Sequence, residues 1–331
     1  MDETTTRRRH RAILAQVEPV AAHAAALPAG MAVVERGWLS ANAVLFDGAA
    51  GTAIVDTGYG THAAQTVALV RDALDASGPG RTLDRIVNTH LHSDHCGGNA
   101  ALQAAWPQAR TAIPPGQAAQ VAAWDEQALG YAPTGQQCPR FHVDELLVPG
   151  GTVALGDQQW QVHAAPGHDP HAVVLFEPAS RTLLSGDALW RTGFGVVFPE
   201  IEGGDAFGAV AATLDLIESL APAAVVPGHG PAFTDVADAL SRARRRLDGF
   251  VRTPERHAHY AAKVLLKFKL LELQRAPLAA LVQWALATEY FGLLAGRYFP
   301  DRDRAAWIGG LVADLQAAGA ARLEGGAVVN M

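Results

Sequence analysis

The chain has 331 residues, 49% of them hydrophobic and 18% charged, which is typical of a globular protein with a substantial core. Its formal net charge of −7 argues against attraction of the whole molecule to nucleic acid or to an anionic membrane surface. Two cysteines give no disulfide framework, and no apolar run has the length of a membrane helix or the pattern of a secretory signal, so we expect a cytoplasmic protein.

The first part of the chain alternates between short apolar runs and turn residues. Residues 1–30 are a polar start and an Ala-rich stretch that we expect to be helical. Asp47-Gly48 predicts a hairpin turn, and the strand after it ends in Asp56-Thr57-Gly58. The expected strands are residues 33–39, 43–46 and 52–55, and the expected helix is residues 61–76.

A dense cluster of metal-binding side chains follows the apolar, β-branched run at residues 83–89. The cluster contains His90, His92, Asp94 and His95, and it precedes a stretch that predicts a helix. In an extended backbone, residues two apart project to the same side, so the first three can converge while His95 points elsewhere. Neutral imidazole and carboxylate are ligands for zinc and iron. The sequence therefore predicts a metal-binding loop at the end of a sheet.

Three more residues of the same types stand beside glycines, each just after a short apolar run. They are His168 in Pro-Gly-His, Asp187 in Ser-Gly-Asp and His229 in Pro-Gly-His-Gly. Binding and catalytic residues are often carried on loops that a rigid sheet positions. We therefore expect these three loops to complete the site begun by the first cluster.

Two segments are candidates for the wall of a substrate pocket. Residues 130–151 are rich in Gly and Pro, and such a long irregular connection predicts a partial cover over the site. Trp190, Phe194 and Phe198 closely follow Asp187, so they either line an apolar pocket or belong to the ordinary core. The nearby bases are Arg140 and Arg191 alone, which makes the cleft poorly suited to a polyanion.

The C-terminal part differs in charge and pattern from the rest. Residues 241–331 contain 14 Lys and Arg against 8 Asp and Glu, a balance of +6, whereas residues 1–240 carry −13. Helices are expected at residues 233–253, 257–273, 278–288 and 302–319, followed by a hairpin around Glu324-Gly325-Gly326.

The order of three helices and a hairpin predicts a winged-helix-like domain, so we divide the chain into residues 1–240 and 241–331. The expected third helix carries Asp301, Asp303 and Asp314 and few bases after Arg304, so it is not a convincing reader of a nucleic-acid groove. We do not expect nucleic-acid binding. Two roles remain for this domain: it forms a homodimer, or it shapes the cleft.

The five motifs from Asp56 to His229, in this order, resemble those of the metallo-β-lactamase-fold hydrolases, in the branch that includes glyoxalase II and lactonases. The resemblance implies an α+β fold, a four-layer αβ/βα sandwich over roughly residues 30–240, with the helical domain after it. It also implies two divalent metal ions, zinc first and iron or manganese as alternatives. The ligands implied are His90, His92 and His168 for the first metal, Asp94, His95 and His229 for the second, and Asp187 as a bridge.

The function that this resemblance implies is hydrolysis of a small ester, thioester or lactone by a metal-bound hydroxide. Asp94 would be the catalytic residue, which orients that hydroxide or shuttles its proton. The alternative is a phosphodiesterase or ribonuclease using the same centre. Asp187 takes the place of a Cys found in the antibiotic-degrading lactamases, which argues against β-lactam hydrolysis. The basic residues with which glyoxalase II binds glutathione have no clear counterpart here. We therefore expect a small-molecule substrate of undetermined identity and no membrane partner.

Overall fold

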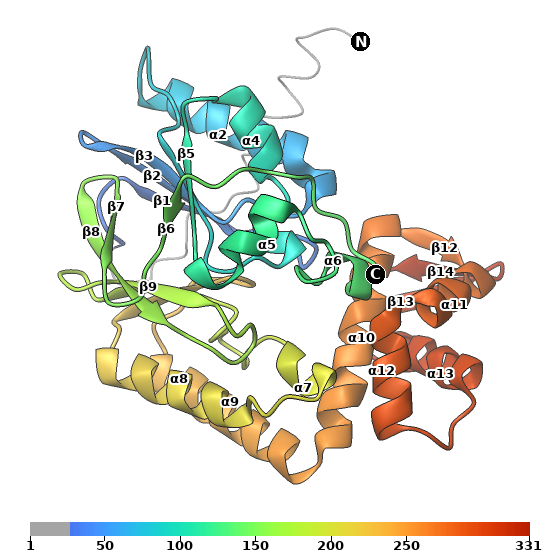
Figure 1. The fold of residues 1–331 in the computed structure, drawn as a ribbon. Coiled ribbons are helices and arrows are strands. Elements are labelled where there is room, and N and C mark those ends of the chain that lie inside the picture. The colour runs from blue at the N-terminus through green and yellow to red at the C-terminus, as the bar shows by residue number, and fades with distance from the viewer. Residues whose placement is uncertain (1–26) are drawn as a thin grey trace, which may run out of the picture.

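The structure is a computed structural model that describes residues 27–331, so most of the Ala-rich helix expected at the N-terminus lies outside the described residues. Two mixed sheets face each other, and helices cover the outer face of each one (Figure 1). This is the four-layer αβ/βα sandwich expected from the sequence. The expected fold class is therefore confirmed, and a helical region follows the sandwich.

The first sheet has six strands in chain order. They are β1 (Met31–Val34), β2 (Ala43–Gly48), β3 (Gly51–Val55), β4 (Arg85–Val87), β5 (Arg110–Ile113) and β6 (Glu145–Leu146). The pairs from β1 to β3 are antiparallel and those from β3 to β6 are parallel. The expected hairpin between β2 and β3 is present, but strand β2 continues through Asp47 and Gly48 to pair with Gly51, so the turn lies two residues later than expected.

The second sheet is formed by the strands of the second half. They are β7 (Thr152–Leu155), β8 (Gln158–Ala164), β9 (Val173–Glu177), β10 (Thr182–Gly186) and β11 (Ala224–Pro227), in the order β11-β10-β9-β8-β7. In this second sheet, only β10 and β11 are parallel neighbours. Strands β9, β10 and β11 are buried along their whole length, because one face meets the first sheet and the other is covered by helices.

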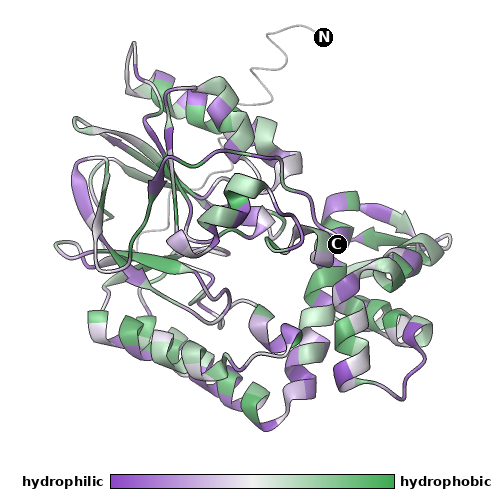
Figure 2. Ribbon diagram, in the orientation of Figure 1, coloured by the Kyte–Doolittle hydropathy of each residue, from purple (hydrophilic) through white to green (hydrophobic). Residues whose placement is uncertain are grey.

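Apolar side chains from the two sheets meet in one core. Phe46 and Val87 of the first sheet belong to the same buried cluster as Trp160, Val162 and Leu175 of the second. Helices α2 (Ala63–Ser77) and α4 (Asn99–Ala105) cover the first sheet, and α8 (Phe207–Leu220) and α9 (Val236–Arg252) cover the second. Hydrophobic residues are concentrated in the strands and alternate with hydrophilic ones along these helices (Figure 2).

The connections between the layers contain short helices. These are η1 (Gly60–His62), α3 (Ser93–Cys96), η2 (Pro115–Gln117), α5 (Ala118–Ala123), α6 (Tyr131–Thr134) and α7 (Phe198–Glu202). The segment predicted to be irregular at residues 130–151 contains only α6 and the two-residue strand β6. This segment leads from β6 of the first sheet to β7 of the second.

The C-terminal region combines helices with a small sheet. It contains α10 (Pro254–Leu273), β12 (Arg275–Pro277), α11 (Leu278–Ala287), α12 (Glu289–Tyr298), α13 (Arg304–Ala317), β13 (Ala321–Glu324) and β14 (Ala327–Asn330). The three expected helices and the hairpin are present. Strand β12, which pairs with β14, and helix α12 were not anticipated. The winged-helix assignment itself stays a prediction.

This region packs directly on the sandwich. Val196 and Ile201 of the sandwich share one buried cluster with Leu265 and Leu266 of α10 and Phe291 of α12. Helix α9 is continuous across the expected boundary at residue 240. Over the described residues, no single helix is long and apolar enough to cross a membrane; only α11 and α12 taken together reach that length, across a bend of 77°.

The division into two domains predicts a site of preferential proteolysis. Residues 251–256, around the break between α9 and α10 at Thr253, are all exposed. We therefore expect limited proteolysis of the native protein to cut within residues 230–256 before it cuts any ligand-bearing strand, with mass spectrometry locating the cut. A chain that stays intact across this segment while it is cut elsewhere would contradict two separable units.

Candidate metal centre

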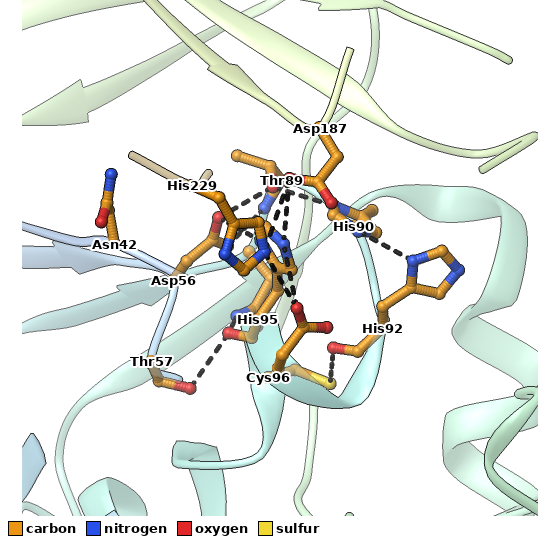
Figure 3. A network of polar contacts seen from close by, with 12 residues as sticks. Asn42, Asp56, Thr57, Thr89, His90, His92, His95, Cys96, Asp187 and His229 are labelled. Atoms are coloured by element: carbon orange, nitrogen blue, oxygen red, sulfur yellow. Dashed lines mark hydrogen bonds and ion pairs between the residues drawn. The ribbon is translucent and has the colours of Figure 1, made fainter. Parts of the chain in front are cut away.

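The predicted metal ligands lie at the ends of neighbouring strands. The loop after β4 carries four of them, namely His90, His92, Asp94 and His95. Within this loop, Ser93–Cys96 forms the short helix α3, which brings Asp94 and His95 back toward the sheets. Asp187 follows β10 in the opposite sheet, and His229 follows β11. Figure 3 shows Asp187 reaching into the cluster, with His92 and His229 on opposite sides of it.

The first group contains three imidazole nitrogens that face one another. His92 Nδ1 lies 3.1 Å from His90 Nε2 and 2.8 Å from His168 Nε2, and the last two nitrogens are 3.3 Å apart. Lone pairs at such distances repel unless a proton or a cation lies between them. The arrangement therefore fits one metal ion held by His90, His92 and His168.

The second group is formed by Asp94, His95 and His229. His229 Nε2 lies 3.0 Å from Asp94 Oδ2, and His95 Nε2 lies 3.9 Å from the same oxygen. Ligand atoms of all three residues lie close enough together to hold one ion. One carboxylate and two imidazoles are a ligand set that zinc, iron and manganese accept.

Asp187 stands between the two groups. Its Oδ2 lies 3.4 Å from His168 Nε2, whereas its Oδ1 lies 3.5 Å from His95 Nε2 and 3.9 Å from His229 Nε2. Each carboxylate oxygen thus faces a different group, as expected of a bridging ligand. Trp190 Nε1 donates a hydrogen bond of 3.0 Å to Oδ1 and fixes the orientation of this carboxylate.

Each histidine in residues 90–95 has a partner on the ring nitrogen that does not face the other candidate ligands. His95 Nδ1 lies 2.8 Å from Asp56 Oδ2, so Asp56 supports the ring of a candidate ligand. His90 Nδ1 lies 3.1 Å from Thr89 Oγ1, and His92 Nε2 lies 3.7 Å from Asp169 Oδ2. Such partners select the tautomer and orient the ring for a metal. Asp169 was missed in the sequence, although it directly follows the predicted ligand His168.

His168 is oriented by a backbone group that no sequence motif reveals. Its Nδ1 donates to the carbonyl oxygen of Val196 at 2.5 Å. Gly195 lies against the same ring, because a Cβ added there would come within 2.3 Å of His168 Nδ1. The segment after Asp187 therefore positions a ligand from another loop, and a side chain at residue 195 would displace that ligand.

Burial and mutual charge set the ionisation of the cluster. Burial lowers the pKa of His168 to about 4 and holds the pKa of His90 well below its usual value. Burial alone would raise the pKa of Asp187, but the imidazoles of His229 and His95 outweigh it and hold that pKa well below the usual range. Neutral imidazole and ionised carboxylate are the forms that bind metals.

Two nitrogens of the cluster are buried without any hydrogen-bond partner among the described residues: His95 Nε2 and His229 Nδ1. A buried polar nitrogen without a partner is costly, and a native structure normally provides one. For His95 Nε2, a metal ion in the second group would be that partner. The residues present therefore fit a site for divalent metals.

A cavity of about 270 Å³ opens beside the cluster, just below the ~300–1,000 Å³ typical of small-molecule sites. As expected, Trp190 and Phe198 line it. The expectation for Phe194 is wrong. Trp190 and Gly193 close a tight turn, so Phe194 emerges on the far side and packs against Phe250, with ring centroids 6.1 Å apart.

Two segments and one exposed ring complete the wall. The connection at residues 130–151 contributes Tyr131, Thr134 and Gln136, so it covers the site in part, as expected. Arg140, Phe141 and His142 line a different surface hollow. No sequence pattern indicated the role of Trp38, which is 53% exposed and stacks on His229, or the contribution of helices α10 and α12.

Phe198 offers a direct test of the apolar wall. Its half-buried ring lies 4.7 Å from the ring of His92, so Phe198→Ala should raise KM for an apolar acyl substrate roughly tenfold while metal content stays unchanged. Phe207→Ala is the matched control, because Phe207 is equally half-buried but does not line the cavity. Equal KM values for the two variants would remove Phe198 from the substrate pocket.

A four-layer sandwich with clustered His and Asp at its strand ends defines a metal-binding αβ/βα protein. Residues 36–229 match the sequence profile of the metallo-beta-lactamase superfamily. The chain belongs to this superfamily, which confirms the resemblance found in the sequence.

Two hydroxyacylglutathione hydrolases are among the curated relatives. The one from Anaeromyxobacter dehalogenans (strain 2CP-C) is 34% identical over 157 residues, 47% of this chain and 51% of the relative. The one from Rhodospirillum rubrum is 30% identical over 119 residues, 36% of this chain and 39% of the relative. The chain thus spans about half, or less, of the length of the curated relatives that it matches.

Solved structures show the same fold. A beta-lactamase domain protein from Burkholderia ambifaria has a TM-score of 0.53 at 20% identity and covers 96% of each chain. A metallo-beta-lactamase family protein from Thermus thermophilus has a TM-score of 0.53 at 20% identity, over 92% of this chain and 100% of its own. TTHA1623, solved in a di-iron-bound form, has a TM-score of 0.50 at 28% identity, over 64% of this chain and 98% of its own.

Proposed function

We propose that this protein is a dinuclear metal-dependent hydrolase of a small thioester, ester or lactone. The observation that carries the proposal is the position of Asp187, whose two carboxylate oxygens face two separate groups of candidate ligands beside an open cavity. The hydroxyacylglutathione hydrolases among its relatives, which act on a thioester by name, support this class of substrate.

The proposed ligands are those expected from the sequence: His90, His92 and His168 for one ion, Asp94, His95 and His229 for the other, and Asp187 for both. Zinc is the first candidate, and iron is supported by the di-iron form of TTHA1623. Two bound divalent ions supply a nucleophile at neutral pH and stabilise negative charge on the carbonyl oxygen.

The chain's own residues supply orientation and proton transfer. Asp94 lines the cavity, and its Oδ2 lies 3.0 Å from His229 Nε2 in the second ligand group, so it is placed to take a proton from a water at the reacting carbonyl and to pass it to the leaving group. The rings of Trp38, Trp190 and Phe198 line the cavity and make part of its wall apolar. Asp94 is therefore the proposed catalytic residue.

The alternative, a phosphodiesterase or ribonuclease, ranks lower. Phosphate groups are recognised mainly by Arg and Lys, and no Arg or Lys of the described residues lines the cavity. Arg191 is engaged by Asp235, and Arg140 donates to the carbonyl of Ala122 on another surface. The two bases nearest in sequence thus lie outside the site.

One experiment tests the proposed function. The purified protein is analysed for metal and then offered equimolar thioester, lactone and phosphodiester substrates before and after removal of metal by a chelator. We expect close to two ions per chain and chelator-sensitive cleavage of a thioester or lactone. Cleavage of the phosphodiester alone would overturn the proposal in favour of the alternative.

A further inference from the structure

Apart from the histidines, the ionisable side chains of the described residues that line the substrate cavity are acidic or phenolic. Of the described residues, those that line the cavity include no Lys or Arg, whereas Glu202 and Asp169 line it in addition to the ligand carboxylates. Asp169 lies against His92 and backs a ligand, as described above. Glu202 is therefore the one lining carboxylate of the described residues that is neither a proposed ligand nor in contact with one.

Glu202 is connected to the metal centre by a continuous line of side chains. The ring of Phe198 lies 4.7 Å from that of His92 and 5.9 Å from that of Tyr290. The hydroxyl group of Tyr290 in turn donates a hydrogen bond to Glu202 Oε1. Because Phe198 and Glu202 are four residues apart on helix α7, they lie on the same face of that helix.

The carboxylate of Glu202 has no cationic partner among the described residues. Arg297 lies close to Gly203, where an added Cβ would meet its guanidinium, but it makes no ion pair with Glu202 and does not line the cavity. The neighbouring Glu200 behaves differently, since it is buried and accepts from the backbone N–H of Ala206 and Phe207. Glu202 alone on α7 offers its charge to a ligand.

We infer that the site selects thioesters and esters with an apolar acyl group and an uncharged or cationic leaving group, and that Glu202, held by Tyr290, sets this charge preference. The aromatic faces of Phe198 and Tyr290 beside a carboxylate suit an alkylammonium group. An anionic carrier such as glutathione would bring its carboxylates against Glu202. The inference rests on the proposed function for the identity of the reacting bond.

The first test holds the acyl group constant and changes only the charge of the leaving group. S-butyrylthiocholine is cationic, S-butyryl-N-acetylcysteamine is neutral and S-butyrylglutathione is anionic. In each case water adds to the carbonyl, the C–S bond breaks, and butyrate and a free thiol are released and measured. We expect kcat/KM to be lowest for the glutathione thioester and highest for the thiocholine ester.

Variants then assign the preference to Glu202. Glu202→Gln keeps an acceptor for Tyr290 and should lower the ratio of cationic to anionic kcat/KM about tenfold, and Glu202→Lys should lower it about a hundredfold. Tyr290→Phe, which keeps the buried ring, should give a smaller decrease. Glu255→Lys is the matched control, because Glu255 is exposed on α10 and does not line the cavity.

A binding measurement separates this inference from the proposed function. Butyltrimethylammonium and butanesulfonate are titrated into metal-free protein, with tryptophan fluorescence as the readout, since Trp38 and Trp190 line the cavity. We expect tighter binding of the ammonium in the wild type and of the sulfonate in Glu202→Lys. Absence of cleavage of every thioester, ester and lactone tested would overturn the proposed function, whereas equal binding of the two probes, or no effect of Glu202→Lys, would overturn the charge preference.

Discussion

Replacing Asp187 with alanine should reduce the metal content of the purified protein from close to two ions per chain to one or fewer, and should lower hydrolysis at least ~1,000-fold. Among residues 27–331, Asp187 is the one whose separate oxygens face both proposed ligand groups, at 3.4 Å from His168 Nε2 and 3.5 Å from His95 Nε2. Its loss removes a ligand from each ion and a negative charge from between them, so both ions should bind more weakly.

Two matched variants define what Asp187 contributes. Asp187→Asn keeps the shape of the side chain and one acceptor oxygen for Trp190, so it should retain more metal than alanine but little activity. Asp72→Ala, at an exposed position on α2, should change neither property. Metal analysis and a thioester assay on the same preparations give both readouts. An active Asp187→Ala enzyme with two ions would contradict the bridging role.

The convergence of His90 and His92 could be predicted because their arrangement is local. His90 and His92 are two residues apart in an extended segment, so the spacing alone places them together. The expectation that Asp94 joins them while His95 points elsewhere is wrong, because helix α3 turns both Asp94 and His95 toward His229.

The later ligands could be predicted because each stands beside a glycine just after an apolar strand. The structure brings His168, Asp187 and His229 to the same place because neighbouring strands end at a common edge of each sheet.

The substrate pocket could be predicted only in part, because its walls come from segments that are distant in sequence. Nothing in the residues around Val264, Phe268 or Tyr290 indicates that helices α10 and α12 reach the metal centre. Trp190 and Phe194 show the same limit on a smaller scale. The tight turn between them directs one ring to the cavity and the other to the core. Both residues are aromatic, so the sequence does not show which ring takes which position.

The carboxylate of Asp56 should be required for tight metal binding although it belongs to neither ligand group. Asp56 Oδ2 lies 2.8 Å from His95 Nδ1, and its two oxygens accept from the backbone N–H and the hydroxyl of Thr89, each at 2.9 Å. Asp56→Ala would leave these three buried donors without an acceptor, so we expect the protein to lose roughly 2–4 kcal/mol of unfolding free energy. The affinity for the second metal should fall about 10–100-fold, since His95 loses the partner that orients it.

The backbone at Asp56 makes a second substitution informative. Its φ of 57° is left-handed, a conformation that Asn adopts more readily than Ala, so Asp56→Asn keeps the local geometry and removes only the charge. We therefore expect Asp56→Asn to unfold close to the wild-type temperature while still binding the second metal more weakly. Asp157→Ala, which removes an exposed carboxylate that accepts from the backbone of Ala50, is the control for loss of a supporting Asp elsewhere. Thermal unfolding and competition of the metal-free protein with a zinc-binding dye measure the two effects separately. Neither Asp56 variant supplies an anion to the Nδ1–H of His95. Wild-type zinc affinity in both variants would therefore show that His95 is oriented without this carboxylate.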